Sequence, residues 1–258
     1  MSNPLQTKNE FVEVFSDIAA LARAAAQRFV RLAKEAVAIR GVFTVSLSGG
    51  STPKSLYTLM ATDPGLRVSI PWSEIHFFFG DERHVPPDNT ESNFRMANEA
   101  MFQRLSPYGT NVHRIHTEQP DAAQAASEYK DDLAEFFHGH RLMVAGVPRF
   151  DLIFLGMGPD GHTASLFPHT PALHETDRWM VANWVEKFKA YRITMTFPVL
   201  NNAAEVILCV AGFEKASMVR EVLERTAHAP QYPVQMVQPN NGIKRWMLDK
   251  AAASQLTK

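Results

Sequence analysis

The sequence predicts an α/β fold in which a mostly parallel sheet is covered by helices on both faces. Three observations support this class. Strongly apolar strand-like segments end in glycine-containing loops, helical segments lie between them, and most of these strand-like segments are apolar on both faces, unlike a half-exposed strand. With 258 residues, 45% of them hydrophobic, the chain is long enough to bury a large core. We expect a single domain over residues 1–258.

The composition excludes several classes of protein. The 26 Lys and Arg residues nearly balance the 27 Asp and Glu residues, so no broad positive field is available for a nucleic-acid partner. No segment approaches the roughly 18 uncharged apolar residues of a membrane span, and the N-terminus lacks the pattern of a secretory signal. The single cysteine, Cys209, lies in an apolar run and forms no internal disulfide. These features favour a cytoplasmic protein without membrane or nucleic-acid partners.

The first predicted element is an amphipathic helix near the N-terminus. Its apolar residues recur at intervals of three and four, which places them on one helical face. They are Phe11, Phe15, Ile18, Ala22, Ala25, Phe29, Leu32 and Ala36. We expect this face to pack against the core.

Three units of strand and loop follow the predicted helix. Strands are expected at 42–47, 75–79 and 151–155, and their loops begin at Ser48, Gly80 and Gly156. The first loop leads into a helix from Lys54. Further strands are expected at 192–197, 205–211 and 243–248, and helices at 121–138 and 214–225. Because ligands bind beyond the carboxyl ends of strands in such sheets, the three loops are expected to share one site.

The first loop is suited to hold a phosphate group. It consists of Ser48, Gly49, Gly50, Ser51 and Thr52. Glycines let the backbone amides turn towards an anion, the hydroxyl groups add donors, and the following helix presents its positive end. The lysine of the pattern G-x-x-x-x-G-K-[ST] is absent, so a nucleoside triphosphate is not indicated. An ordinary turn before a capped helix would use the same residues.

The second loop concentrates charge directly after an aromatic strand. Asp81, Glu82 and Arg83 follow Gly80, and His84 comes next. Burying such a set costs free energy unless it serves a function, whereas a solvated loop costs little. Catalysis and plain surface charge therefore both remain open at this point.

The third loop, which begins at Gly156, satisfies the pattern G-x-G-x-x-G but does not indicate a dinucleotide. Pro168 and Pro171 would end a following helix within about two turns, and no suitable acidic residue follows. The glycines instead free the backbone around Asp160 and His162. We expect His162 in the first turn of a short helix, whose positive end keeps the ring neutral and able to act as a general base.

Two cations near later strand ends could complete a phosphate site. Arg192 and Lys215 would supply the charge that a phosphate dianion requires. The spacing of the histidines, among them His113, His116 and His140, matches no zinc pattern, and no G-x-S-x-G elbow is present. We therefore expect neither a metal nor another cofactor.

Taken together, these loops resemble the 6-phosphogluconolactonases of the glucosamine-6-phosphate isomerase/6-phosphogluconolactonase family. The matching pieces run in order over residues 15 to 248, and the most specific is GMGPDGHTASLFP, which begins at Gly156. The others are SGGSTP, GDER, SNFR, RIT with Pro198 and Asn201, and GFEKA. The resemblance implies a Rossmann-like fold similar to that of glucosamine-6-phosphate deaminase and ribose-phosphate isomerase.

Two positions separate the lactonases from the deaminases of this family. The deaminase pattern has a tyrosine after Asp-Glu and a Phe-Asn-Glu-Pro run after its histidine. Here Arg83 takes the tyrosine position, and Phe167 takes the place of the ring-opening glutamate. The resemblance therefore favours a lactonase.

The resemblance implies hydrolysis of 6-phospho-D-glucono-1,5-lactone to 6-phospho-D-gluconate in the oxidative pentose phosphate pathway. The expected partner is a small phosphorylated sugar lactone, and the expected assembly is a monomer or a small homo-oligomer. The glycine-serine loop, Arg192 and Lys215 would hold the phosphate. His162 would activate water, Asp160 would orient the ring, and Arg83 would stabilise the oxyanion. Asp81 and Glu82 would position either Arg83 or the substrate hydroxyl groups.

Two alternatives remain beside this activity. The first is a glucosamine-6-phosphate deaminase or another sugar-phosphate isomerase, which ammonia release would reveal. The second is a non-catalytic sugar-phosphate sensor, which would bind the ligand without needing His162.

Overall fold

The computed structural model describes residues 9–105, 111–224 and 231–257. Its centre is a seven-stranded sheet in which every neighbouring pair of strands is parallel. The strand order is β1 (Glu10–Phe15), β12 (Ile243–Asp249), β11 (Glu205–Val210), β8 (Leu152–Leu155), β2 (Phe43–Leu47), β3 (Ile75–Phe79) and β5 (Asn111–Val112). This confirms the α/β class.

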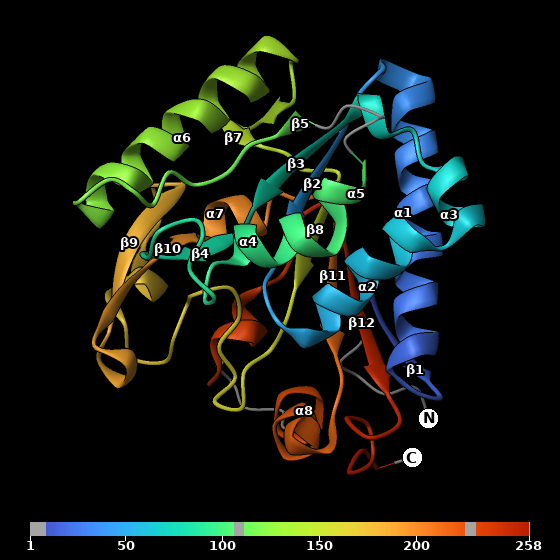
Figure 1. The fold of residues 1–258 in the computed structure, drawn as a ribbon. Helices are drawn as coiled ribbons and strands as arrows, with labels where there is room; N and C mark the ends of the chain where they lie inside the picture. The colour runs from blue at the N-terminus through green and yellow to red at the C-terminus, as the bar shows by residue number, and fades with distance from the viewer. Residues whose placement is uncertain (1–8, 106–110, 225–230, 258) are drawn as a thin grey trace.

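Helices cover the sheet on both sides (Figure 1). One layer contains α1 (Ile18–Arg40), α2 (Ser51–Thr62) and α3 (Pro64–Ser69), and the opposite layer contains α6 (Ala122–Gly139). Shorter α-helices are α4 (Asn93–Ala97), α5 (Gln103–Leu105), α7 (Phe197–Leu200) and α8 (Ala216–Glu224). A π-helical turn spans Asn98–Phe102, and 3-10 turns span Trp72–Glu74, Pro171–His174, Glu186–Phe188, Phe213–Lys215 and Pro233–Met236. No helix in these described ranges is long and apolar enough to cross a membrane.

The prediction of a helix from Phe11 was wrong at its start. Phe11 and Phe15 lie on β1, which pairs in parallel with β12 at the edge of the sheet. The helix begins only at Ile18, because Asp17 has an extended backbone and its carboxylate accepts a hydrogen bond from the Ala20 N–H at 2.8 Å. The apolar spacing of three and four continued across this boundary by coincidence.

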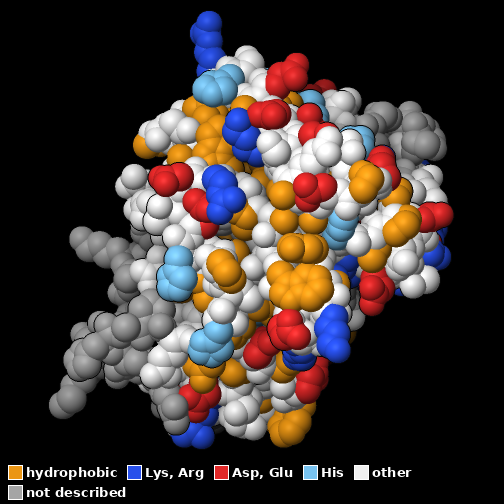
Figure 2. All heavy atoms as spheres, turned by 90° about the vertical axis from the view of Figure 1, so that its left-hand side faces the viewer, with side chains coloured by type: hydrophobic (Ala, Val, Ile, Leu, Met, Phe, Trp, Pro, Cys, Tyr) orange, Lys and Arg blue, Asp and Glu red, His pale blue; other side chains and the backbone are white. Residues whose placement is uncertain are grey.

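A second, antiparallel sheet lies beside the first. It contains β4 (Asp81–Arg83), β10 (Ala190–Met195) and β9 (Met180–Val185), and α6 packs against it. Residues 81–83, predicted as a loop, therefore form a strand. A two-stranded ribbon joins β6 (Met143–Val144) and β7 (Val147–Pro148). Hydrophobic side chains gather on the face that carries α6, β9 and β10 (Figure 2), and Trp184, Phe188 and Tyr191 are exposed.

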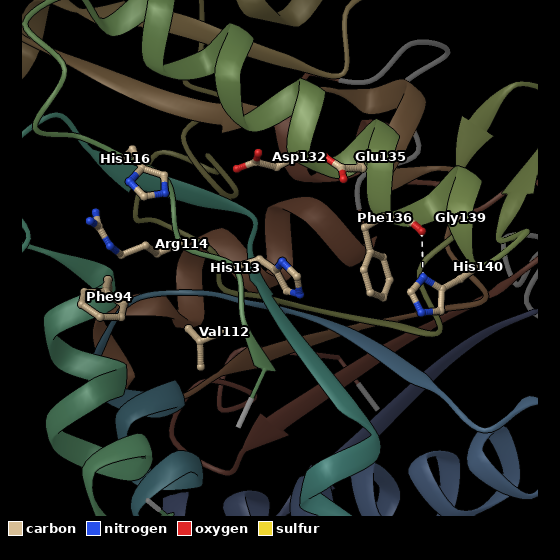
Figure 3. A pocket seen from close by; sticks show the side chains of 10 residues that line it. All are labelled: Phe94, Val112, His113, Arg114, His116, Asp132, Glu135, Phe136, Gly139 and His140. Carbon is tan, nitrogen blue, oxygen red and sulfur yellow. Dashed lines mark hydrogen bonds between the residues drawn. The ribbon is translucent and has the colours of Figure 1, made fainter. Parts of the chain in front are cut away.

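Three histidines meet at the β3 and β5 edge of the main sheet. His76 Nδ1 lies 2.9 Å from His113 Nε2, and the ring of His76 is 5.7 Å from that of His140. Phe136 of α6 lies between His113 and His140 (Figure 3), with ring centroids 5.2 and 4.1 Å away. Aromatic stacking therefore joins α6 to this edge of the sheet.

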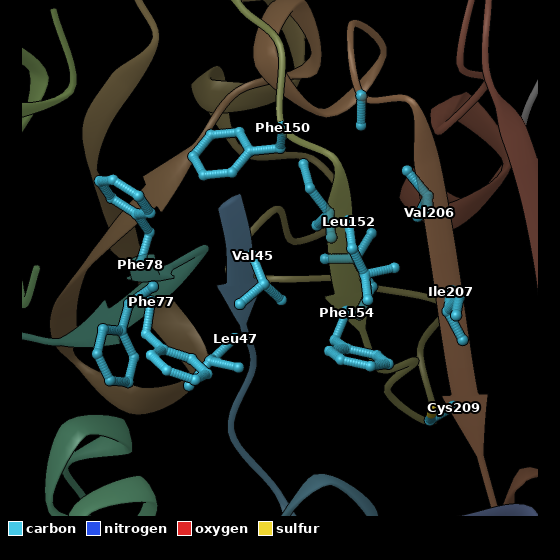
Figure 4. Packing of buried hydrophobic residues seen from close by; sticks show 14 of the residues in the cluster. Val45, Leu47, Phe77, Phe78, Phe150, Leu152, Phe154, Val206, Ile207 and Cys209 are labelled. Atoms are coloured by element: carbon cyan, nitrogen blue, oxygen red, sulfur yellow. The ribbon is translucent and has the colours of Figure 1, made fainter. Parts of the chain in front are cut away.

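The core lies on both faces of the central strands. Every residue of β2, β8 and β11 is buried, as expected for parallel strands covered on both sides. Phe29 of α1 packs edge-on against Phe43 at 5.4 Å and stacks on Phe77 and Phe154 at 6.4 Å. Side chains from β2, β3, β8 and β11 meet in this core (Figure 4). Burial also raises the pKa of the Cys209 thiol to about 12.

Candidate active site

A polar cavity of about 220 Å³ opens where β2, β3, β8 and β11 end. It is lined by Ser48, Gly49, Gly50, Asp81, Arg83, Asn93, Gly156, Met157, Gly158, Pro159, His162, Thr163, Ala164 and Lys215. The chain runs from β2 to β3 on one side and later returns to β8 on the other side of β2. The cavity therefore lies at the point where strand order reverses, the usual ligand site of such a sheet. A larger cavity, about 670 Å³, lies beside α6 and contains none of these loops.

The first loop has the conformation that an anion site requires. Gly50 has φ of +110°, and no side chain caps α2, so the first amides of this helix are open to a ligand. Tyr57 fixes the loop from α2, because its hydroxyl accepts from Ser48 N–H and donates to Ser48 C=O, both at 3.0 Å. Ser48, Gly49 and Gly50 line the cavity, whereas Ser51 is exposed, Thr52 is buried and neither lines it.

Lys215 brings a positive charge to this part of the cavity. It lies in the 3-10 turn that follows β11. Its ammonium group forms no ion pair with any residue that the structure describes. Lys215 therefore lines the cavity with a cation that is unpaired within the described ranges, and its predicted role in phosphate binding stays a prediction.

His162 and Asp160 form a close pair on the third loop. His162 Nδ1 lies 2.5 Å from Asp160 Oδ1, and the His162 backbone N–H donates to the same oxygen at 3.3 Å. Because the carboxylate accepts, Nδ1 carries the proton and Nε2 remains free to accept one. Burial opposes ionisation of Asp160, but the hydrogen bonds that His162 donates outweigh it and lower the pKa of the carboxyl group.

Glycines allow this loop to fold tightly around the histidine. A Cβ on Gly158 would lie 2.0 Å from both Cε1 and Nδ1 of His162. Gly161 has φ of +74°, and a Cβ there would lie 2.7 Å from Tyr232. Gly158 N–H also donates to His162 C=O at 2.8 Å. This confirms the geometric part of the prediction, since the glycines let the backbone fold around Asp160 and leave room for the His162 ring.

The predicted helix after Gly161 does not form. Residues 161–167 make a turn in which Thr163 bridges Leu166, so the expected dipole of a helix starting at this loop is absent. Thr163 Oγ1 instead donates to Gly156 C=O at 2.8 Å, and this contact closes the loop on itself. The ring of His162 stacks on Phe167 at 4.1 Å. Its orientation therefore comes from Asp160 and Phe167.

The two neighbouring carboxylates of β4 point to different surroundings. Glu82 is buried and does not line the cavity, and burial raises the pKa of its carboxyl group despite bonds from backbone N–H groups. Asp81 and Arg83 line the cavity, as the alternation of side chains along a strand requires. Arg83 Nη1 donates to Glu91 C=O, which holds the guanidinium at the rim.

Arg192 lies beside the cavity, not in its lining. It lies opposite Arg83 in the register of β10 and β4, and its guanidinium lies 5.1 Å from the ring of Phe188. Burial, together with the charge of Arg83, lowers the pKa of Arg192. Lys187, on the same hairpin as Phe188, places Nζ 3.9 Å from Asp160 Oδ2. This hairpin thus contributes charge next to the loop that carries Asp160 and His162.

Three contributors to the site were missed from the sequence. Asn93 lines the cavity, Tyr57 holds Ser48, and Lys187 approaches Asp160. Asn93 could have been found from the sequence, because it belongs to the SNFR piece of the family resemblance. Lys187 and Tyr57 are brought near by the hairpin and the helix, which local spacing does not reveal. Among the residues with described coordinates, no group of three or more His, Cys, Asp or Glu could hold a metal ion.

Comparison with known proteins places this arrangement in a family. Residues 16–246 match the model described as glucosamine-6-phosphate isomerases/6-phosphogluconolactonase. The chain belongs to this family. It is 42% identical over 222 residues to the 6-phosphogluconolactonase of Synechocystis sp., and the alignment covers 86% of this chain and 88% of the relative. It is 35% identical over 208 residues to the 6-phosphogluconolactonase of Haemophilus influenzae, with 81% and 85% covered.

Solved structures of family members share the fold. The 6-phosphogluconolactonase from Trypanosoma cruzi superimposes with a TM-score of 0.84 at 28% identity and covers 99% of this chain and all of its own. The corresponding enzyme from Trypanosoma brucei has a TM-score of 0.84 at 29% identity and covers 97% of this chain. The predicted fold similar to that of this family is thereby confirmed.

Proposed function

We propose that this protein hydrolyses 6-phospho-D-glucono-1,5-lactone to 6-phospho-D-gluconate, as an enzyme of the oxidative pentose phosphate pathway. The observation that carries the proposal is the pairing of His162 with Asp160 in a cavity that also contains open amides and Lys215. This cavity combines groups that can hold an anion with a group able to move a proton. The names of the relatives, which match over most of the chain, support the same activity.

The anchor comes first in the proposed reaction. Backbone N–H groups at Gly49 and Gly50, the positive end of α2 and the Lys215 ammonium bind the phosphate. Arg83 and Arg192 lie opposite one another on antiparallel strands, and such like charges repel. A bound anion would relieve this repulsion, which supports a role for both arginines with an anionic substrate.

The chemical step uses the free nitrogen of His162. Nε2 takes a proton from water as the water oxygen bonds to C1, while Asp160 stabilises the imidazolium through Nδ1–H. Arg83 stabilises the oxyanion that forms on the C1 oxygen. The intermediate then breaks the bond between C1 and the ring oxygen, and the imidazolium returns the proton to that oxygen. The products are the open-chain hydroxyl group and the carboxylic acid, which releases its proton to solvent to give the carboxylate.

The test is lactone consumption by purified protein, corrected for spontaneous hydrolysis and run with a metal chelator. We expect His162→Ala to lower kcat by on the order of a hundredfold or more, as for loss of a general base. Binding of 6-phosphogluconate, measured by calorimetry, should change little. Near-normal turnover by this variant would refute the role of His162. Ammonia release from glucosamine 6-phosphate would instead support the deaminase alternative.

A further inference from the structure

Asp81 and Glu82 are adjacent, yet their hydrogen bonds differ sharply. Glu82 accepts from the backbone N–H groups of Arg83, Asn93 and Phe94 at 2.7–2.8 Å and from Ser92 Oγ at 3.1 Å. These four donors occupy both of its oxygens. Glu82 is therefore a structural residue that holds the start of α4 against β4.

Asp81 keeps an oxygen with spare capacity. It is only 7% exposed and lines the cavity, and Oδ2 accepts from Ser165 Oγ at 2.6 Å. Oδ1 has only a long contact of 3.4 Å from Asn93 Nδ2. Within the described ranges no cation lies within 4.0 Å of this carboxylate. A buried carboxylate with an unfilled acceptor is costly unless a ligand supplies a donor.

A second acceptor without a partner lies next to Asp81. Asn93 Nδ2 donates to Asp81 C=O at 2.9 Å, and this bond fixes the direction of the amide. Its Oδ1 is enclosed against Gly49, where an added Cβ would lie 1.9 Å away. Asn93 Oδ1 and Ser48 Oγ are buried without a hydrogen-bond partner in the described part of the chain. Ser48 Oγ is a hydroxyl that can donate or accept, whereas Asp81 Oδ1 and Asn93 Oδ1 can only accept, so this corner of the cavity favours a ligand group that donates.

We propose that Asp81 Oδ1 accepts a hydrogen bond from a hydroxyl group on the sugar ring, with Asn93 and Ser165 as positioning residues. The inference rests on the proposed function, and it assigns the role that the sequence left open between two carboxylates. A site built to pair with a hydroxyl group rejects an analogue that lacks it, because the buried acceptor is then left unpaired. The ligand class is therefore a polyhydroxylated lactone, and its deoxy analogues are poor substrates.

The experiment compares the parent lactone with its 2-, 3- and 4-deoxy analogues. In the natural protein at least one analogue should have kcat/KM about 10- to 150-fold lower than the parent, as for loss of a hydrogen bond to a charged group. In Asp81→Ala this ratio should fall to below about threefold, because the contact is already lost. Changes in the overall charge of the cavity affect all four substrates equally and cancel in the ratio.

Two further variants guard against misfolding and unspecific effects. Asp81→Asn keeps the side-chain volume and replaces the charged acceptor by a neutral one, so it should bring the ratio below about tenfold. Asp131→Ala removes a carboxylate that is 68% exposed on α6 and should leave the ratio unchanged. Equal kcat/KM for all four lactones in the natural protein, or a ratio that survives in both Asp81 variants, would overturn the inference.

A different outcome would refute the proposed function but not the Asp81 contact: the natural protein does not hydrolyse the parent lactone at all. In that case calorimetry with 6-phosphogluconate and its three deoxy counterparts measures the contact directly. A loss of affinity of about tenfold or more for one deoxy compound, absent in Asp81→Ala, would support the hydroxyl contact without hydrolysis. Equal affinities would reject it.

Discussion

Gly158 is the position where one methyl group tests the geometry of the His162 and Asp160 pair. A Cβ there would lie 2.0 Å from His162 Cε1 and Nδ1 and 2.9 Å from Asp160 Oδ1, whereas ordinary contact begins at 3.4 Å. In Gly158→Ala the ring would therefore have to move by about 1.4 Å, the difference between the first and last of these distances. The backbone itself should tolerate alanine, since Gly158 is not among the glycines with positive φ.

A displacement of about 1 Å at a reacting group costs on the order of a hundredfold in rate, or about 2.7 kcal/mol in the activation barrier. We therefore expect kcat of Gly158→Ala to fall about a hundredfold. The proposed anion anchor at Gly49, Gly50 and Lys215 is not displaced, so affinity for 6-phosphogluconate should change by less than about threefold.

The assay is initial-rate lactone consumption, with thermal unfolding as a check that the variant folds. Gly139→Ala is the matched control, because an added Cβ there has no atom within 4 Å and the backbone φ is not positive. It should keep normal kcat. If Gly158→Ala hydrolyses the lactone within about threefold of the natural rate, the ring position deduced here does not control catalysis.

Three further outcomes follow from other contacts. Glu82→Gln should lower the free energy of unfolding in urea by about 2–4 kcal/mol, because one oxygen that faces donors becomes a donor; an unchanged midpoint would contradict this. Burial and the charges of His113 and His140 lower the pKa of His76 from 6.5 to about 4. As the pH falls from 6.5 towards 4, the unfolded state therefore takes up a proton before the folded state does. The free energy of unfolding decreases by about 1–2 kcal/mol over this range, after allowance for a half-buried ring. His76→Gln should flatten that slope in unfolding measured at several pH values. Lys215→Met should weaken 6-phosphogluconate binding about 10- to 150-fold and leave binding of gluconate unchanged, and equal losses would argue against phosphate contact.

The parallel sheet could be predicted because burial on both faces leaves a clear mark on composition. In β8 and β11 apolar residues predominate without alternation, and such strands occur where helices cover both sides. β2 alternates in sequence, but its Thr44 and Ser46 are buried as well. Once the strands are parallel, their carboxyl ends share one edge, so loops distant in sequence converge. The loops at Gly49, Asp81 and His162 were brought together for this reason.

Other features depend on tertiary contacts that the spacing of residues in the sequence does not reveal. β1 forms because β12 offers it an edge, and only Asp17 marks where the chain changes to helix. The surroundings of His162 are set by Phe167 and by the closure of Thr163 onto Gly156. A helix propensity estimate for six residues cannot outweigh such tertiary contacts.

Asp81 and Glu82 have different surroundings because residues 81–83 form a strand and not a loop. Treated as a loop, residues 81–83 give no reason to separate the two carboxylates. Treated as a strand paired with β10, they alternate, so Asp81 and Arg83 share one face and Glu82 takes the other. The face towards the cavity then carries one acceptor and one cation, which suits a substrate with a hydroxyl group near a carbonyl that becomes anionic. The opposite face carries the carboxylate that holds the start of α4. In the proposed function this three-residue strand binds ligand on one side and fixes the scaffold on the other.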